Sequence, residues 1–188
     1  MLTSTDPLPH RPRRVLVAGV AGSGKTTLAA RIARITGGAH TEIDGLYHGA
    51  GWMPRPQFLA DVETFTALDS WTTEWQYTAA RPMLAERADL LVWLDVPFAT
   101  VALPRVIRRT LRRRVFRQQL WNGNVEPPLR TIFTDPEHIV RWAVSTRGKY
   151  AGQVPALELD RPELVIVRLH SPRDVKRWLA GPLVDATR

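Results

Sequence analysis

One eight-residue segment constrains this chain more than any other part of its sequence: residues 19–26, which read Gly-Val-Ala-Gly-Ser-Gly-Lys-Thr. It follows a short apolar run at residues 15–18 and precedes apolar side chains that recur at helical spacing. Its glycines let successive backbone N–H groups point inward, and the helix beginning near Lys25 adds the positive end of its dipole. A strand, a glycine-rich loop and a helix in this order predict a P-loop, which binds phosphate groups.

The residues of this loop have separate expected roles. We expect Lys25 to reach the β- and γ-phosphates of ATP, and Thr26 to give its hydroxyl to Mg²⁺. A chance match to the full pattern arises in roughly one chain in a hundred, and the flanking strand and helix make chance rarer still. The residues expected to bind the phosphates are Gly19, Gly22, Ser23, Gly24, Lys25, Thr26 and Thr27.

Length and composition narrow the class of protein. A chain of 188 residues suits one α/β domain, and 44% hydrophobic residues are typical of a globular protein. The absence of cysteine excludes disulfides and thiolate metal sites, so any metal would bind oxygen ligands. The net charge of +8 indicates an anionic partner, which phosphorylated small molecules and nucleic acids satisfy equally.

The start of the chain lacks the apolar core of a signal peptide. No apolar run reaches the roughly 18 residues that span a bilayer. We therefore expect a cytoplasmic protein without a membrane partner. Residues 1–12 contain three prolines and little that packs, so they predict a flexible leader before a single domain at residues 13–188.

Strands and helices are expected to alternate along that domain. The apolar patterns predict strands at residues 15–18, 39–43, 71–74, 90–94 and 164–169. Helices are expected from Lys25 to about Gly37, and at residues 57–68, 99–119, 136–147 and 172–179. This order predicts a parallel sheet that collects ligands at the carboxyl ends of its strands, where Gly19, Asp44, Glu74 and Asp95 fall.

The segment after the second strand is the candidate acceptor site of a small kinase. Asp44 would orient or deprotonate an acceptor hydroxyl, or hold a water on Mg²⁺. The alternative is a turn cap, because Asp before Gly is a common turn pair. The side chains that would line the acceptor pocket, or merely pack, are His40, His48, Trp52 and Arg55.

A second kinase feature is a run of seven arginines from Arg105 to Arg117. Guanidinium groups suit the spread charge of a phosphoryl group in transfer, so we expect Arg105 and Arg109 to act from a lid at about residues 105–141. Arg141 and Arg147 on the next helix would close from the other side. A solvated or RNA-facing basic helix is the alternative. A buried stripe is expected at Val101, Ile107, Leu111 and Val115, with Arg105, Arg108, Arg109 and Arg112 on another face.

Other P-loop proteins fit less well. No Asn-Lys-x-Asp guanine reader occurs, and the chain lacks room for the oligomer-forming additions of ATP-driven motors. From residue 15 to residue 180 the chain resembles the adenylate-kinase-like small P-loop kinases, most closely the group named after a DNA topology modulation protein. The resemblance rests on the P-loop and on residues 40–48, 51–52, 105–114 and 120–124.

This resemblance implies a three-layer α/β sandwich with a five-stranded parallel sheet in the order 2-3-1-4-5. It also implies ATP and Mg²⁺ at the P-loop, an acceptor near Asp44, and an arginine-bearing lid between Arg109 and Arg141. Where the group usually carries Asp-Gly-Asn-Tyr, this chain has Glu74, Trp75, Gln76 and Tyr77. Glu74 would keep the acidic role at Mg²⁺, whereas Trp75 replaces a glycine where backbone approaches a ligand. The Asp-Gly-x-Pro-Arg segment of true adenylate kinases is missing.

Three hypotheses follow from the sequence. The leading one is an ATP-dependent phosphotransferase acting on a nucleoside, a nucleotide or another small hydroxyl compound. The second is a nucleic-acid-binding protein switched by nucleotide, for which the arginine run is the motive. The third is a degenerate kinase that binds nucleotide without transferring phosphate, for which Trp75 is the motive.

Overall fold

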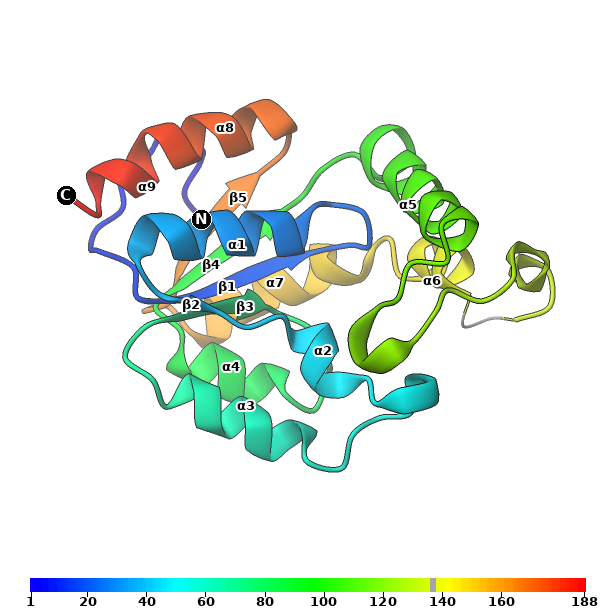
Figure 1. Ribbon diagram of the computed structural model, residues 1–188. Helices are drawn as coiled ribbons and strands as arrows, with labels where there is room; N and C mark the ends of the chain where they lie inside the picture. Colours follow the sequence, from blue (N-terminus) through cyan, green and yellow to red (C-terminus); the bar gives the residue numbers. More distant parts are fainter. Residues whose placement is uncertain (136–137) are drawn as a thin grey trace.

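A five-stranded parallel sheet forms the centre of the protein, with the strands in the order β2-β3-β1-β4-β5. The structure is a computed structural model that describes residues 1–135 and 138–188. Helices cover both faces of the sheet, so the predicted three-layer architecture and strand order are confirmed (Figure 1). The strands are β1 (Arg14–Gly19), β2 (Ala39–His40), β3 (Trp71–Glu74), β4 (Leu90–Leu94) and β5 (Val165–Leu169).

The helices fall into three groups (Figure 1). One face of the sheet is covered by α1 (Lys25–Thr36), α8 (Pro172–Ala180) and α9 (Pro182–Asp185). The other face is covered by α3 (Phe58–Thr66), α4 (Arg81–Arg87) and α7 (Lys149–Asp160). Beyond the carboxyl ends of the strands lie α2 (Ile43–Tyr47), α5 (Leu103–Val115) and α6 (Ile139–Ser145).

Two apolar cores follow from the alternation of side chains along the strands. In β1, Val15 and Val17 pack beneath α1 and α8, whereas Leu16 and Ala18 pack against the helices of the other face. All four are fully buried. Because the central strand is covered on both sides, its sequence is a continuous apolar run, as a parallel strand requires.

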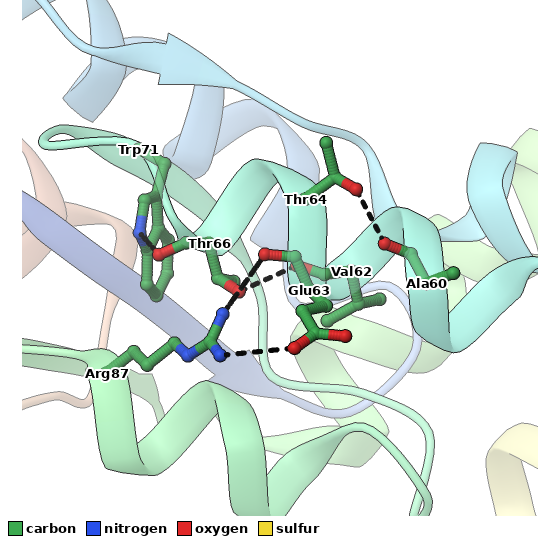
Figure 2. Close-up of polar contacts among 7 residues, drawn as sticks. All are labelled: Ala60, Val62, Glu63, Thr64, Thr66, Trp71 and Arg87. Atoms are coloured by element: carbon green, nitrogen blue, oxygen red, sulfur yellow. Dashed lines mark hydrogen bonds and ion pairs between the residues drawn. The ribbon is translucent and has the colours of Figure 1, made fainter.

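Trp71 joins β3 to α3 and α4 in the second of these cores. Its indole Nε1 donates to the carbonyl of Thr66 at 3.2 Å, and the ring is fully buried. Arg87 donates to the Thr66 hydroxyl at 2.7 Å and to the carbonyl of Glu63 at 3.0 Å, with the Glu63 carboxylate 3.9 Å away (Figure 2). The last turn of α4 is thereby held against the last turn of α3.

The second strand is shorter than its sequence predicts, because the chain leaves the sheet early. A strand is expected at residues 39–43, but β2 ends at His40 and α2 begins at Ile43. The backbone N–H of Ile43 donates to the Glu74 carboxylate at 3.2 Å instead of joining the sheet. A side chain from the neighbouring strand thus ends β2.

The basic helix also differs from its prediction. A π-helical turn, Phe98–Ala102, precedes α5, and α5 ends at Val115 rather than near residue 119. The expected buried stripe is wrong at three of its four residues: Ile107, Leu111 and Val115 are exposed. Val106 and Thr110 are buried in their place, because α5 packs only along the narrow side that meets α6 and the P-loop.

Four helices were not expected: α2, α4, α7 and α9. The helix predicted at residues 136–147 is α6, which begins at Ile139 after His138 caps it by accepting from the N–H of Val140 at 3.3 Å. Its expected first residue, Pro136, lies outside the described residues. No helix in the described part of the chain is long and apolar enough to cross a membrane.

The first residues of the chain contact the domain. Leu2 forms a parallel bridge with Val167 in β5, and both Leu2 and Leu8 pack against the core beneath α8. The expectation that this leader has little to pack is therefore wrong at these two leucines, since their side chains cover apolar surface at the edge of the sheet.

The tie between Trp71 and α3 predicts a clear stability effect. Trp71→Ala removes a fully buried ring and should lower the free energy of unfolding by about 3–5 kcal/mol. Leu159→Ala, at an exposed leucine of α7, should change it by less than about 0.5 kcal/mol. Chemical denaturation followed by circular dichroism measures both. Equal losses in the two variants would contradict this assignment of the core.

Candidate active site

The P-loop leaves the N-terminus of α1 open. No side chain caps α1, and its first turn contains no acidic residue. Gly24, which precedes it, has a left-handed backbone with φ of 103°. Gly22 also has positive φ, and a Cβ there would lie 2.2 Å from the carbonyl oxygen of Ala102. The loop can therefore take only glycine at position 22, and the uncapped first turn of α1, with its helix dipole, suits phosphate oxygens.

Lys25 projects into the site among charged side chains. Its ammonium donates to the carbonyl of Val20 at 3.3 Å. Burial lowers the pKa of Lys25 to about 8; Asp44 and Glu74 counteract this shift, whereas Arg109 and Lys149 add to it. Carboxylates and other cations thus act on the same ammonium. Phosphate oxygens beside Lys25 would favour its charged form.

Glu74 and Thr26 form the part of the site that fits Mg²⁺. Burial alone would raise the pKa of Glu74, but His40, the N–H of Ile43 and the Thr26 hydroxyl together hold it below its ordinary value. Oε1 of Glu74 is buried without a hydrogen-bond partner and lies 3.6 Å from His40 Nε2. An ionised carboxylate with a free oxygen beside a hydroxyl matches the oxygen ligands that Mg²⁺ prefers.

Few protein side chains would bind Mg²⁺ at this place. The described residues contain no group of three or more acidic or histidine side chains placed to hold a metal ion. Mg²⁺ commonly binds through one or two protein oxygens together with water and substrate phosphates. Thr26 and Glu74 would be such ligands, directly or through water.

Asp44 is held in place by side chains that follow β3. Its Oδ1 accepts from the Tyr77 hydroxyl at 2.6 Å and from Gln76 Nε2 at 3.1 Å. The Tyr77 hydroxyl also lies 3.2 Å from His48 Nε2. Burial, followed by the charge of Asp44, raises the pKa of Tyr77, so its hydroxyl keeps its proton. Asp44 therefore belongs to a fixed network and not merely to a turn.

Aromatic rings surround this network. Tyr47 stacks on Tyr77 with 3.9 Å between the ring centroids, and a Cβ on Gly45 would lie 3.0 Å from the ring of Trp121. Asn124 accepts from the N–H of Trp52 at 3.1 Å and donates to the carbonyl of Gly49 at 2.8 Å. The segment after α5 is in this way bonded to the segment after α2.

The arginines of α5 take different positions. Arg105 donates to the carbonyl of Ser23 in the P-loop at 3.3 Å. Arg109 is exposed on α5, and the protein atoms around its guanidinium, followed by the charge of Arg113, lower its pKa. Arg113 pairs with the buried carboxylate of Glu126 at 3.2 Å. Arg105 therefore contacts the P-loop directly, and the lid role expected of Arg105 and Arg109 stays a prediction.

A cavity of about 330 Å³ adjoins the P-loop between α1 and α8. Its position beside Ser23, Gly24 and Thr27 suits the ribose and base of a nucleotide whose phosphates lie in the loop. Its remaining lining residues are Leu28, Arg31, Leu94, Val96, Arg105, Pro172, Val175 and Lys176. A second cavity of about 320 Å³, beside Met1, contains none of the predicted site residues.

The remaining candidates divide between the site and other places. His40 lies beside Glu74, His48 lies beside Tyr77, and Trp52 is bonded to Asn124. Arg55 pairs with Asp61 at 2.9 Å. Arg141 and Arg147 are exposed and donate to the carbonyls of Phe133 and Val144. Their predicted closing role is not reflected in contacts with the P-loop.

Sequence reasoning missed three residues of the site: Gln76, Tyr77 and Lys149. The first two were noticed only as part of a departure from a family pattern, and their contact with Asp44 joins positions more than thirty residues apart. Lys149 begins a helix that was not expected. Its single positive charge carries no sequence pattern that identifies it.

No family model and no curated protein matches the sequence. Among solved structures, the fold is similar to a gluconokinase from Sinorhizobium meliloti 1021, with a TM-score of 0.53, 21% identity, and coverage of 94% of this chain and 95% of that chain. The chain has a P-loop kinase fold.

Two further solved structures match with lower TM-scores. A sugar kinase from Janibacter sp. HTCC2649 gives 0.45, with 21% identity and coverage of 92% and 97%. A shikimate kinase from Acinetobacter baumannii in complex with shikimate gives 0.47, with 15% identity and coverage of 93% and 88%.

The close approach at Gly22 predicts that nucleotide binding is lost in Gly22→Ala. The added methyl would meet the carbonyl of Ala102 and occupy a backbone with φ of 78°, so the loop must open. Gly152→Ala is the matched control, because nothing lies within 4 Å of a Cβ there. Calorimetric titration with Mg-ATP measures both. Wild-type affinity for Mg-ATP in Gly22→Ala would contradict the assignment of the P-loop as the phosphate-binding site.

The lowered pKa of Lys25 predicts proton uptake on nucleotide binding. Below pH 8 the buried ammonium opposes folding in full. Between pH 8 and about 10.4 the unfolded chain retains a proton that the folded chain has lost, so this group makes stability rise with pH. Bound phosphates would reverse the shift, so nucleotide binding at pH 8.5 should take up part of a proton.

Calorimetric titrations in buffers of different ionisation enthalpy measure this uptake. Lys25→Met should abolish the dependence on buffer while the chain stays folded. A wild-type binding enthalpy that is the same in every buffer would show that Lys25 does not change protonation.

Proposed function

We propose that this protein is an ATP-dependent kinase that transfers a phosphoryl group to a hydroxyl of a small molecule. One observation carries the proposal: the charges of Asp44 and Glu74 act on the ammonium of Lys25 at the open N-terminus of α1. In a phosphoryl transfer, the groups that bind the donor and those that bind the acceptor must lie next to each other.

Different residues would bind ATP, hold Mg²⁺ and orient the acceptor. The P-loop N–H groups and Lys25 would bind the phosphates of ATP, and Thr26 and Glu74 would hold Mg²⁺. ATP with its Mg²⁺ would supply the activated phosphoryl group. Asp44, positioned by Tyr77 and Gln76, would orient the acceptor hydroxyl and accept the proton that it loses.

The lid arginines would stabilise the negative charge in transit. Arg109 lies close enough to Asp44 for the charge of that carboxylate to act on it. Arg105 is bonded to the P-loop and lines the cavity proposed for the nucleotide. An arginine in such a place contributes electrostatic stabilisation that water cannot supply.

Trp75 does not argue for a degenerate kinase. Its N–H donates to the carbonyl of Val17 at 2.9 Å, which continues the pairing of β3 with β1. Its ring is buried, and its backbone does not adopt the left-handed conformation that favours glycine. The motifs shared with the topology modulation group agree with a kinase and leave the acceptor open. Nucleic-acid binding through exposed arginines of α5 stays a prediction.

A screen for ADP release with Mg-ATP tests the proposal. Nucleosides, nucleoside monophosphates, sugars and sugar acids are offered as acceptors. Lys25→Ala should lower kcat/KM for any accepted compound by at least about 100-fold, because it removes the charge beside the transferred group. Arg34→Ala, at the exposed end of α1, is the matched control and should keep wild-type turnover. Unchanged turnover in Lys25→Ala would rule out this mechanism.

A further inference from the structure

Arg81, the first residue of α4, is a buried cation without a carboxylate partner. The residue is 8% exposed. Its Nη1 donates to Gln153 Oε1 at 2.8 Å, whereas Nε and Nη2 are buried without a partner at hydrogen-bond geometry. The Tyr150 hydroxyl is near enough for the guanidinium to offset part of the rise in pKa that burial causes in Tyr150. In residues 1–135 and 138–188, no Asp or Glu forms an ion pair with it. Burying an uncompensated charge is costly, so this arrangement needs an explanation.

The two unpaired atoms form one edge of the guanidinium. Nε–H and Nη2–H point the same way and constitute the fork that binds two oxygens of a carboxylate or phosphate side by side. The group lies against two neighbouring rings, 5.2 Å from the centroid of Trp75 and 5.6 Å from that of Tyr150, and these two centroids are 6.1 Å apart. Gln153 holds the opposite side. The free edge is therefore fixed in orientation.

Arg87, at the other end of the same helix, shows the usual arrangement. Its guanidinium donates to the Thr66 hydroxyl and the carbonyl of Glu63, with the Glu63 carboxylate nearby (Figure 2). It is more exposed than Arg81, yet it has more partners. Helix α4 can thus pair an arginine with protein groups at one end and leaves the buried arginine at its other end unpaired.

Arg81 lies on the acceptor side of the site. Tyr150 donates to the carbonyl of Trp75, the residue that follows Glu74, at 3.1 Å. Burial and then the charge of Arg81 lower the pKa of Lys149, and Lys149 in turn acts on Lys25. The charges of Asp44 and Glu74 reach Tyr150 as well. The charged neighbour of Arg81 is therefore a second cation, Lys149, and not a counterion.

We propose that the free edge of Arg81, assisted by Lys149, binds a carboxylate or phosphate group of the acceptor. The acceptor is then an anionic hydroxyl compound, such as a hydroxy acid or a phosphorylated alcohol, and not a neutral sugar or nucleoside. This inference rests on the proposed kinase function for the identity of the ligand as an acceptor. The binding site itself rests on Arg81.

Calorimetric binding tests it with pairs of probes that differ in charge. D-gluconate is compared with D-glucose, D-glycerate with glycerol, and CMP with cytidine, each with the P-loop saturated by a non-hydrolysable ATP analogue. At least one anionic probe should bind about tenfold or more tightly than its neutral counterpart, since charge-assisted hydrogen bonds are the strong ones. Whether an acid or CMP shows the preference separates a carboxylate from a phosphate ligand.

Variants test whether Arg81 causes the preference for the anionic probe. Arg81→Gln should abolish it, and Arg81→Lys, which keeps the charge without the fork, should reduce it. Arg87→Gln is the matched control and should retain it. Circular dichroism and binding of the ATP analogue establish that each variant is folded. If Arg81→Gln does not fold, Arg81→Lys decides alone.

The outcomes separate this inference from the proposed function. No preference for any anionic probe, or a preference that survives in Arg81→Gln and Arg81→Lys, overturns the Arg81 site. Anion binding that depends on Arg81 without phosphoryl transfer from Mg-ATP upholds the site and overturns the kinase. Transfer to a neutral acceptor at the wild-type rate in Arg81→Gln upholds the kinase and overturns the Arg81 site.

Discussion

Lys25, Arg81, Arg109 and Lys149 place four positive charges around the two carboxylates of Asp44 and Glu74, and the organisation of the site depends on holding these charges. Burial opposes the charged form of Lys25 and lowers its pKa. The carboxylates offset only part of the positive charge. Such an excess of cations in an enclosed site is suited to ligands that bring several negative charges of their own.

The charges can be held there because backbone packing brings two parts of the chain into contact. At Gly22 the P-loop meets the carbonyl of Ala102 so closely that no side chain fits. Val106 and Ala143 then pack on Ala21, so α5 and α6 stand directly over the loop. Farther along, Asn124 bonds to the segment after α2. The arginines of α5 and Asp44 are thereby carried by elements that contact the P-loop or one another.

Predictions from the sequence succeeded where a local pattern reports burial. The apolar run at Leu90–Leu94 is a strand covered on both faces, and its bounds agree with the structure. The same reasoning was wrong for α5, because this helix packs along a narrow side at Val106 and Thr110 and leaves Ile107 and Leu111 exposed. It missed α7, in which Tyr150 and Val154 are buried and Leu157 is partly buried, because Pro155 is untypical of a helix interior.

The sequence by itself determined the P-loop, the parallel sheet and the strand end at which Glu74 lies, because glycine spacing and apolar runs act over a few residues. Only the tertiary structure decided which polar atoms meet. The contact of Asp44 with Tyr77, and the place of Arg81 beside Trp75 and Tyr150, join segments far apart in the chain. Whether a buried charge is paired depends on packing across the sheet, and no local pattern of residues records that.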